Sequence, residues 1–190
     1  MNANAVIDIA YDSTSKKIDS TLQEDILLDK KSSTALFTEI SGSKGLNKRH
    51  IENEFVDFKI QPLLPHMHSK SGPGLAAGDI NGDGVEDFYM GAAAGSEGSF
   101  FIQNKQGEFV EKKLKKDTLF EDMGVLLFDA DNDNDLDLYV VSGGSDNNEG
   151  TATQQDRLYS NDGKGNFTLN AAALPDTKSS GSCVVACDYD

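Results

Sequence analysis

The feature that most constrains this fold is an acidic loop that occurs twice. Residues 79–87 read Asp-Ile-Asn-Gly-Asp-Gly-Val-Glu-Asp, and residues 129–137 read Asp-Ala-Asp-Asn-Asp-Asn-Asp-Leu-Asp. In both loops, oxygen-bearing side chains occupy positions 1, 3, 5 and 9. Position 6 is Gly84 or Asn134, which tolerate a left-handed backbone. This spacing predicts a loop wrapped around a hard cation such as Ca²⁺, which takes roughly six to eight oxygen ligands.

The predicted ligands are the side chains at those four positions and the main-chain carbonyl at position 7. The first loop would supply Asp79, Asn81, Asp83, the Val85 carbonyl and Asp87. The second would supply Asp129, Asp131, Asp133, the Asp135 carbonyl and Asp137. A solvated acidic turn is the alternative, since Asp, Asn and Gly are common in turns. The five carboxylates of the second loop would repel one another without a counter-ion, which favours the metal site.

The sequence around the loops argues against an EF-hand. An EF-hand loop carries a bidentate Glu at position 12 and lies between helices. Position 12 here is Met90 in the first loop and Val140 in the second. The residues that follow the loops, 88–90 and 138–141, are aromatic and β-branched, which is typical of strands. The loops are therefore predicted to be hairpin turns in a sheet.

The loops belong to a longer internal repeat. Apolar runs precede both of them, at 74–78 and 124–128, and a similar run at 181–187 precedes Asp188 and Asp190, which resemble positions 1 and 3 of a third loop. Farther on, residues 100–109 align with residues 158–167 without a gap. Each unit reads strand, acidic loop, strand, strand, glycine turn, strand. Four strands in roughly 50 to 60 residues indicate a β-propeller blade.

The predicted fold is all-β, with about two complete four-stranded propeller blades and the start of a third. The expected divisions are a polar lead-in at 1–34, N-terminal strands at 35–71 that pack on or precede the propeller, blades at 72–120 and 121–178, and the truncated third blade at 179–190. Within 35–71, the alternation at 55–60 predicts a strand. An insertion at 143–156 lengthens the second unit, and such exposed loops often bind partners.

Composition excludes some functions. The net charge of −15 makes nucleic acid an unfavourable partner, because phosphate binding needs a basic surface. No apolar run approaches the ~20 residues of a membrane span. Residues 1–10 lack the features of a signal peptide. Cys183 and Cys187, the two cysteines, are expected to be small buried residues, since their spacing suits neither a disulfide on one strand nor a zinc site.

The three histidines leave two interpretations open. His50, His66 and His68 lie together in the stretch before the first acidic loop, and Glu52 and Asn53 are close to His50 in sequence. A metal or catalytic role is conceivable for such a group. Histidines scattered in this way are more often structural hydrogen-bonding residues.

The runs at 78–88 and 128–138 resemble FG-GAP repeats, also called VCBS repeats, which are shared with the propeller of integrin α-chains. The wider context at 50–58, 63–66 and 156–167 resembles secreted or surface proteins of bacteria, in which such repeats often accompany an ASPIC/UnbV-type region. The resemblance covers roughly residues 36–190. It implies a β-propeller with Ca²⁺ in the hairpin between the first two strands of each blade, here two sites and an incomplete third.

The resemblance further implies extracellular, periplasmic or outer-surface placement and a role in binding, adhesion or scaffolding, with an extracellular protein or glycan as partner. Asn134 departs from the usual glycine of the family. The chain also holds two blades and a fraction where the family has about seven, so we expect a fragment of a longer protein, with open sheet edges that could self-associate. The alternatives are a polysaccharide-active enzyme, whose catalytic carboxylates should lie outside both loops, and a purely architectural segment.

Overall fold

The computed structural model describes residues 37–115, 118–145 and 150–187. By its internal contacts the chain divides into residues 1–38 and residues 39–190, and every strand of the described residues lies in the second unit. The lead-in expected at 1–34 and the third-loop residues Asp188 and Asp190 lie outside the described residues.

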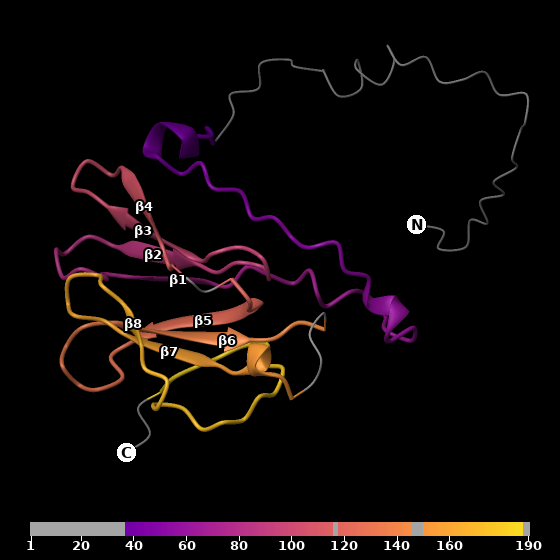
Figure 1. Cartoon of the computed structure of the whole chain (residues 1–190). Helices are drawn as coiled ribbons and strands as arrows, with labels where there is room; N and C mark the ends of the chain where they lie inside the picture. The colour runs from indigo at the N-terminus through magenta and orange to yellow at the C-terminus, as the bar shows by residue number, and fades with distance from the viewer. Residues whose placement is uncertain (1–36, 116–117, 146–149, 188–190) are drawn as a thin grey trace, which may run out of the picture. The chain divides into compact units, whose positions relative to one another are not determined.

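The first sheet is an antiparallel meander of four strands, β1 (Leu75–Gly78), β2 (Asp87–Met90), β3 (Ser99–Gln103) and β4 (Phe109–Lys113) (Figure 1). The first acidic loop joins β1 to β2, and the register pairs Gly78 with Asp87 at its base. In β2 the buried residues Asp87 and Tyr89 alternate with half-buried neighbours, as expected when a strand presents one face to a core. The loop is therefore the hairpin turn that the sequence predicts.

The second sheet repeats this topology with β5 (Asp122–Phe128), β6 (Asp137–Ser142), β7 (Arg157–Ser160) and β8 (Thr168–Leu169). The second acidic loop joins β5 to β6, and Phe128 pairs with Asp137 at its base, in the same register relative to the loop as in the first sheet. The insertion at 143–156 connects β6 to β7 and contains the 3-10 helix η3 (Ala152–Gln154). Both units thus place their acidic loop between the first and second strands.

The core lies between the two sheets. The first unit contributes Ile80, Tyr89, Phe100 and Leu114, and the second contributes Leu138, Val140 and Tyr159, all nearly inaccessible to solvent. Phe100 stacks on Phe167 of the second unit, with ring centroids 4.3 Å apart and planes 10° from parallel. Burial of each large apolar side chain stabilises the fold by about 1.5–3 kcal/mol, so these contacts hold the sheets face to face.

Equivalent residues of successive units stack on one another. A Cβ built on Gly74 would lie 3.2 Å from the carbonyl carbon of Gly124, and one built on Gly124 would lie 3.0 Å from the Cα of Cys183. These three residues occupy the same place in the repeat. The backbone repeats the pattern too, because Asp122 N–H donates to the Ala92 carbonyl (3.0 Å) and Gly181 N–H donates to the Ser142 carbonyl (2.9 Å). Residues 181–183 therefore pack against the second sheet as that sheet packs against the first.

Both units contain a hydrogen bond from a tyrosine to a carboxylate, but the carboxylate belongs to a different part of the chain in each. Tyr89 donates its hydroxyl proton to Asp122 of the following unit (3.2 Å), whereas the equivalent Tyr139 donates to Asp156 of its own unit (2.8 Å). The position equivalent to Asp156 in the first unit is Gly98, where a Cβ would collide with the Tyr89 ring. One carboxylate site is thus filled by two different chain segments.

The prediction of N-terminal strands at 35–71 is wrong for the described residues. No strand forms within residues 37–71, which instead contain the 3-10 helices η1 (Ser41–Lys44) and η2 (Asp57–Lys59). The strand expected at 55–60 fails because Asp57 turns inward, where it is 1% exposed and accepts hydrogen bonds from the backbone N–H groups of His68 (2.6 Å) and Ser69 (3.0 Å). Among the described residues, no helix is long and apolar enough to cross a membrane.

The prediction of buried cysteines is also wrong. Cys183 and Cys187 are both free and exposed. The described residues 181–187 belong to neither sheet, so no strand pairs with them and covers their side chains. The predicted fold class is confirmed: the described residues form an all-β structure of two complete four-stranded antiparallel sheets, consistent with two adjacent blades of a partial β-propeller.

Candidate metal centres in the two acidic loops

The carboxylate at position 1 organises each loop. In the first loop, Asp79 accepts hydrogen bonds from the backbone N–H groups of Gly82 (2.9 Å), Asp83 (3.1 Å) and Gly84 (2.8 Å). The second loop repeats all three bonds on Asp129, with N–H donors from positions 4, 5 and 6 at 2.7, 3.2 and 3.0 Å. The loops therefore share one backbone conformation, and their side chains at equal positions occupy equal places.

Two residues of each loop have a left-handed backbone, and only the one at position 6 was predicted from the sequence. Gly84 (φ 85°) and Asn134 (φ 71°) at position 6 confirm the prediction. Position 4 is also left-handed, at Gly82 (φ 73°) and Asn132 (φ 67°). Gly and Asn are the residues that adopt this conformation most easily, so the signal was present at position 4 as well. The two left-handed residues curl the chain around the position 1 carboxylate.

The carboxylate at position 9 joins each loop to the rest of its sheet. Asp87 and Asp137 are each 1% exposed. Asp87 accepts the N–H of Ile80 (3.2 Å) at position 2 and the N–H of Gln103 (2.7 Å) at the end of β3. Asp137 makes the two equivalent bonds in the second sheet, at 3.0 and 2.9 Å, the second of them from Asn161. Sequence spacing alone gave no sign of the donors at the end of the third strand.

The arrangement of the second loop fits a hard cation. Carboxylate oxygens of Asp129, Asp131 and Asp137, at positions 1, 3 and 9, lie within 4.8 Å of one another. Oxygens that bind one Ca²⁺ at about 2.3–2.6 Å are at most about 5 Å apart, so these three could share one ion. Asn81 replaces Asp131 in the first loop, where the corresponding oxygens come from two carboxylates and one amide. Calcium accepts both kinds of ligand.

Electrostatic repulsion is concentrated in the second loop. Burial and then the negative charges of Asp133, Asp137 and Asp131 raise the pKa of Asp135 to about 6. Burial, followed by the charges of Asp133, Asp137 and Asp129, also raises the pKa of Asp131. In the first loop, burial raises the pKa of Asp87, although hydrogen bonds from Gln103 and Ile80 oppose it. A bound cation would relieve this repulsion and hold the carboxylates ionised.

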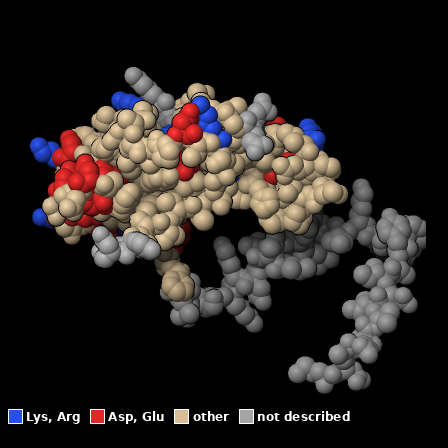
Figure 2. Space-filling model, turned by 90° about the horizontal axis from the view of Figure 1, so that it is seen from below, with Lys and Arg blue, Asp and Glu red and all other residues tan. Residues whose placement is uncertain are grey.

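Asn161 connects the two loops to each other. Its Nδ2 donates to the carbonyl oxygen of Ile80 in the first loop (2.8 Å) and to that of Leu136 in the second (3.1 Å). Both loops lie at the left of Figure 1, and Figure 2 shows acidic side chains gathered at the same side. The sequence did not single out Asn161, because its partners are main-chain atoms of loops 81 and 25 residues away.

The structure places the histidines apart from the acidic loops. His50 Nε2 lies 2.6 Å from Glu52 Oε1, and the rings of His66 and His68 lie 4.4 Å apart. Within the described residues, no group of three or more metal-ligating side chains includes a histidine. The incomplete third site, predicted from Asp188 and Asp190, lies outside those residues.

Comparison with known proteins gives one family match. Residues 79–140 match the family model of the FG-GAP-like repeat, from position 1 of the first acidic loop to β6. No curated protein and no solved structure gave a significant match to the chain. The matched residues include both acidic loops and the strands that follow them. This chain therefore contains a stretch, residues 79–140, that is similar to the FG-GAP-like repeat family.

Proposed function

We propose that this chain is a calcium-stabilised β-propeller segment of an extracellular or cell-surface protein, with a binding, adhesion or scaffolding role and no catalysis of its own. The observation that carries this proposal is the convergence of Asp129, Asp131 and Asp137 within 4.8 Å. The equal hydrogen-bond pattern around Asp79 supports a second ion in the first loop.

Calcium would act here as a structural ion. It would neutralise carboxylates at the base of a hairpin and so link folding stability to the concentration of free ion. Exposed loops of this kind bind Ca²⁺ with weak to moderate affinity, which suits the millimolar calcium found outside cells better than cytosolic calcium. The position 1 and position 9 carboxylates are committed to backbone N–H groups, a role unlike that of a catalytic acid and base.

Calcium titration with calorimetry and thermal unfolding tests the proposal. We expect two bound ions, and a stabilisation of about 2.7 kcal/mol per site when free Ca²⁺ is about 100 times the dissociation constant. Asp79→Asn and Asp129→Asn should each remove one ion. The matched control is Glu54→Gln, an exposed acid outside both loops, which should keep both. Absence of bound calcium and an unchanged unfolding midpoint at about 10 mM Ca²⁺, well above the range for extracellular sites, would overturn the proposal.

A further inference from the structure

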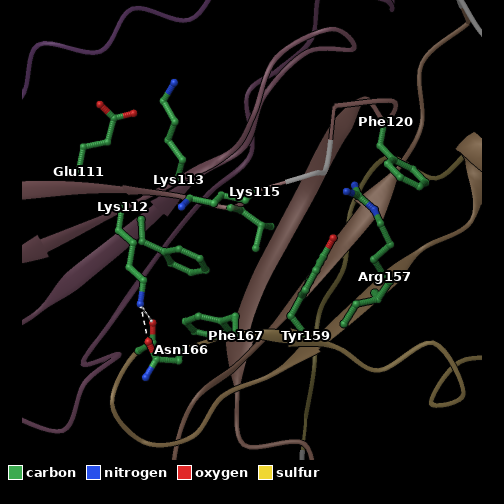
Figure 3. Close-up of a pocket in the computed structure, with 13 residues that line it drawn as sticks. Glu111, Lys112, Lys113, Lys115, Phe120, Arg157, Tyr159, Asn166 and Phe167 are labelled. Atoms are coloured by element: carbon green, nitrogen blue, oxygen red, sulfur yellow. Dashed lines mark hydrogen bonds between the residues drawn. The ribbon is translucent and has the colours of Figure 1, made fainter.

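A pocket of about 820 Å³ opens between the outer strands of the two sheets (Figure 3). Its walls are β4 on one side and β7 and β8 on the other. Aromatic rings line it, including the stacked pair Phe100 and Phe167, together with Tyr159 and Phe120. This volume and this mixture of rings with a few polar groups are typical of a site for a small molecule or one sugar unit.

Two lysines bring positive charge to the pocket. Lys112 reaches across to the second unit, where its Nζ donates to the Gly165 carbonyl (2.5 Å) and to Asn166 Oδ1 (2.9 Å) (Figure 3). Lys115 is exposed at the same wall. No carboxylate of the described residues lies within ion-pair distance of either lysine. Among the described residues, therefore, no carboxylate balances either positive charge, and an anion could pair with both.

The other charged groups of the pocket already have partners. Glu111 lies 3.7 Å from Lys48, and Lys113 lies 3.9 Å from Glu97. Glu111 and Lys113 point away from Lys112 in Figure 3, as alternate residues of a strand do. The buried Arg157 pairs with Asp122 (2.5 Å) and packs over the Phe120 ring. On a chain with a net charge of −15, this pocket thus holds two lysines whose charge no described carboxylate balances.

We propose that this pocket binds an acidic sugar, a uronic acid unit of a polysaccharide. The apolar face of the sugar ring would pack on the half-buried rings of Phe120 and Phe167 and on the exposed Leu169, and its carboxylate would pair with Lys115 and Lys112. The Asn166 amide oxygen supplies an acceptor for a sugar hydroxyl. A concave site of this size suits one ring better than an acidic protein surface, which would need a broad and flatter interface.

This inference rests on the binding role proposed above, but not on calcium. Its test is calorimetric titration of the full chain with trigalacturonate, using the methyl ester of the same trisaccharide as the uncharged probe. We expect the acid to bind about tenfold more tightly than the ester, and Lys115→Gln to remove about that factor for the acid alone. Lys105→Gln is the matched control, because Lys105 is an exposed lysine in the β3–β4 turn and does not line the pocket.

Two further arms separate this proposal from its rivals. Asp129→Asn, which should remove the ion of the second acidic loop, should leave trigalacturonate binding unchanged, so that failure of one proposal does not imply failure of the other. Equal affinity for acid and ester, or no effect of Lys115→Gln, would overturn the inference. It would also be overturned if a hexaglutamate peptide bound as tightly as trigalacturonate and displaced it, since the site would then recognise acidic protein.

Discussion

At the scale of single residues, Asp135 shows most clearly the repulsion between carboxylates in a loop without a cation. Its pKa is raised to about 6, by burial and by three neighbouring carboxylates, although its predicted contribution to the metal is only its main-chain carbonyl. An unfolded Asp titrates near pH 4. Between about pH 4 and pH 6 the folded state therefore holds a proton that the unfolded state has lost, and stability falls as the pH rises through that window.

We therefore predict that Asp135→Asn stabilises the calcium-free protein at pH 7 and has little effect at pH 3.5. The gain should be less than about 1 kcal/mol, because the loop is close to solvent. Urea denaturation with chelator, at several pH values, measures the difference between variant and wild type. Asp176→Asn, an exposed acid paired with Lys178, serves as the control and should show no such widening with pH. A difference that stayed constant from pH 3.5 to pH 7 would contradict the assignment.

Most of the candidate site could be predicted because a nine-residue loop is a local structure. Oxygen spacing gave positions 1, 3, 5 and 9, and the three carboxylates that converge, Asp129, Asp131 and Asp137, belong to that set. The part that sequence could not give is non-local. The backbone N–H donors of Gln103 and Asn161 lie at the end of the third strand of each sheet. The sequence also does not show which carbonyl the Asn161 side chain will contact.

At the scale of secondary-structure elements, the two tyrosine–carboxylate contacts have different surroundings. Asp122 accepts from Tyr89 and from the Ala92 N–H, and its other oxygen faces Arg157 at 2.5 Å, with both side chains 4% exposed. Asp156 accepts from Tyr139 and from an N–H of β6, without an ion pair to any described residue. Asp122 thus joins the first strand of one sheet to the second strand of the other, and balances a buried cation.

This difference predicts unequal costs for two otherwise similar substitutions. Asp122→Asn should destabilise the protein by about 3–5 kcal/mol, because it removes the negative charge from a buried ion pair with the Arg157 guanidinium. Asp156→Asn should cost about 1–2 kcal/mol, the effect of weakened hydrogen bonds alone. Urea denaturation of both variants at equal calcium concentration measures the two values. Equal losses would show that the ion pair contributes nothing beyond the hydrogen bonds.

Secondary structure was predictable where the same sequence pattern occurs in both units of the repeat. The strands that flank the loops appear in both units, at the same distance from the same acidic residues. The pattern at 55–60 occurs only once, and its alternation indicated a strand. The strand does not form because Asp57 is buried there. Hydrogen bonds from Ser69 and His68 outweigh the effect of burial and lower the pKa of Asp57 to about 2. Such a contact 11 or 12 residues away is invisible to periodicity.

At the scale of the whole molecule, stacking of equal units explains both the successful and the failed predictions. The same position of successive units packs in a row, with Gly74 against Gly124 and Gly124 against Cys183. The first described residues of the third unit therefore lie where the first strand of a third sheet would lie. The repeat period predicted this series. It did not predict the exposure of Cys183 and Cys187, because burial of a strand depends on partners on both of its sides.

The charge of the molecule gives a last prediction. The net charge is −15, and nine carboxylates lie in the two acidic loops, four at 79–87 and five at 129–137. Without calcium, their mutual repulsion opposes folding, and salt screens it over a Debye length of about 10 Å at 0.1 M. With chelator, the urea midpoint should therefore rise between about 0.02 M and 0.3 M NaCl. With saturating calcium the rise should be clearly smaller, because two bound ions would neutralise four of the loop charges.

A pair of double variants locates the source of this salt dependence. Asp133→Asn with Asp135→Asn removes two charges from the second loop, and Glu54→Gln with Asp176→Asn removes two exposed charges elsewhere. If repulsion within the loops dominates, the first pair flattens the salt dependence of the calcium-free protein, whereas the second leaves it nearly unchanged. Equal flattening by both pairs would instead attribute the effect to the overall charge of the chain. The loops would then be stabilised by their backbone hydrogen bonds alone, and a calcium requirement would need a different physical cause.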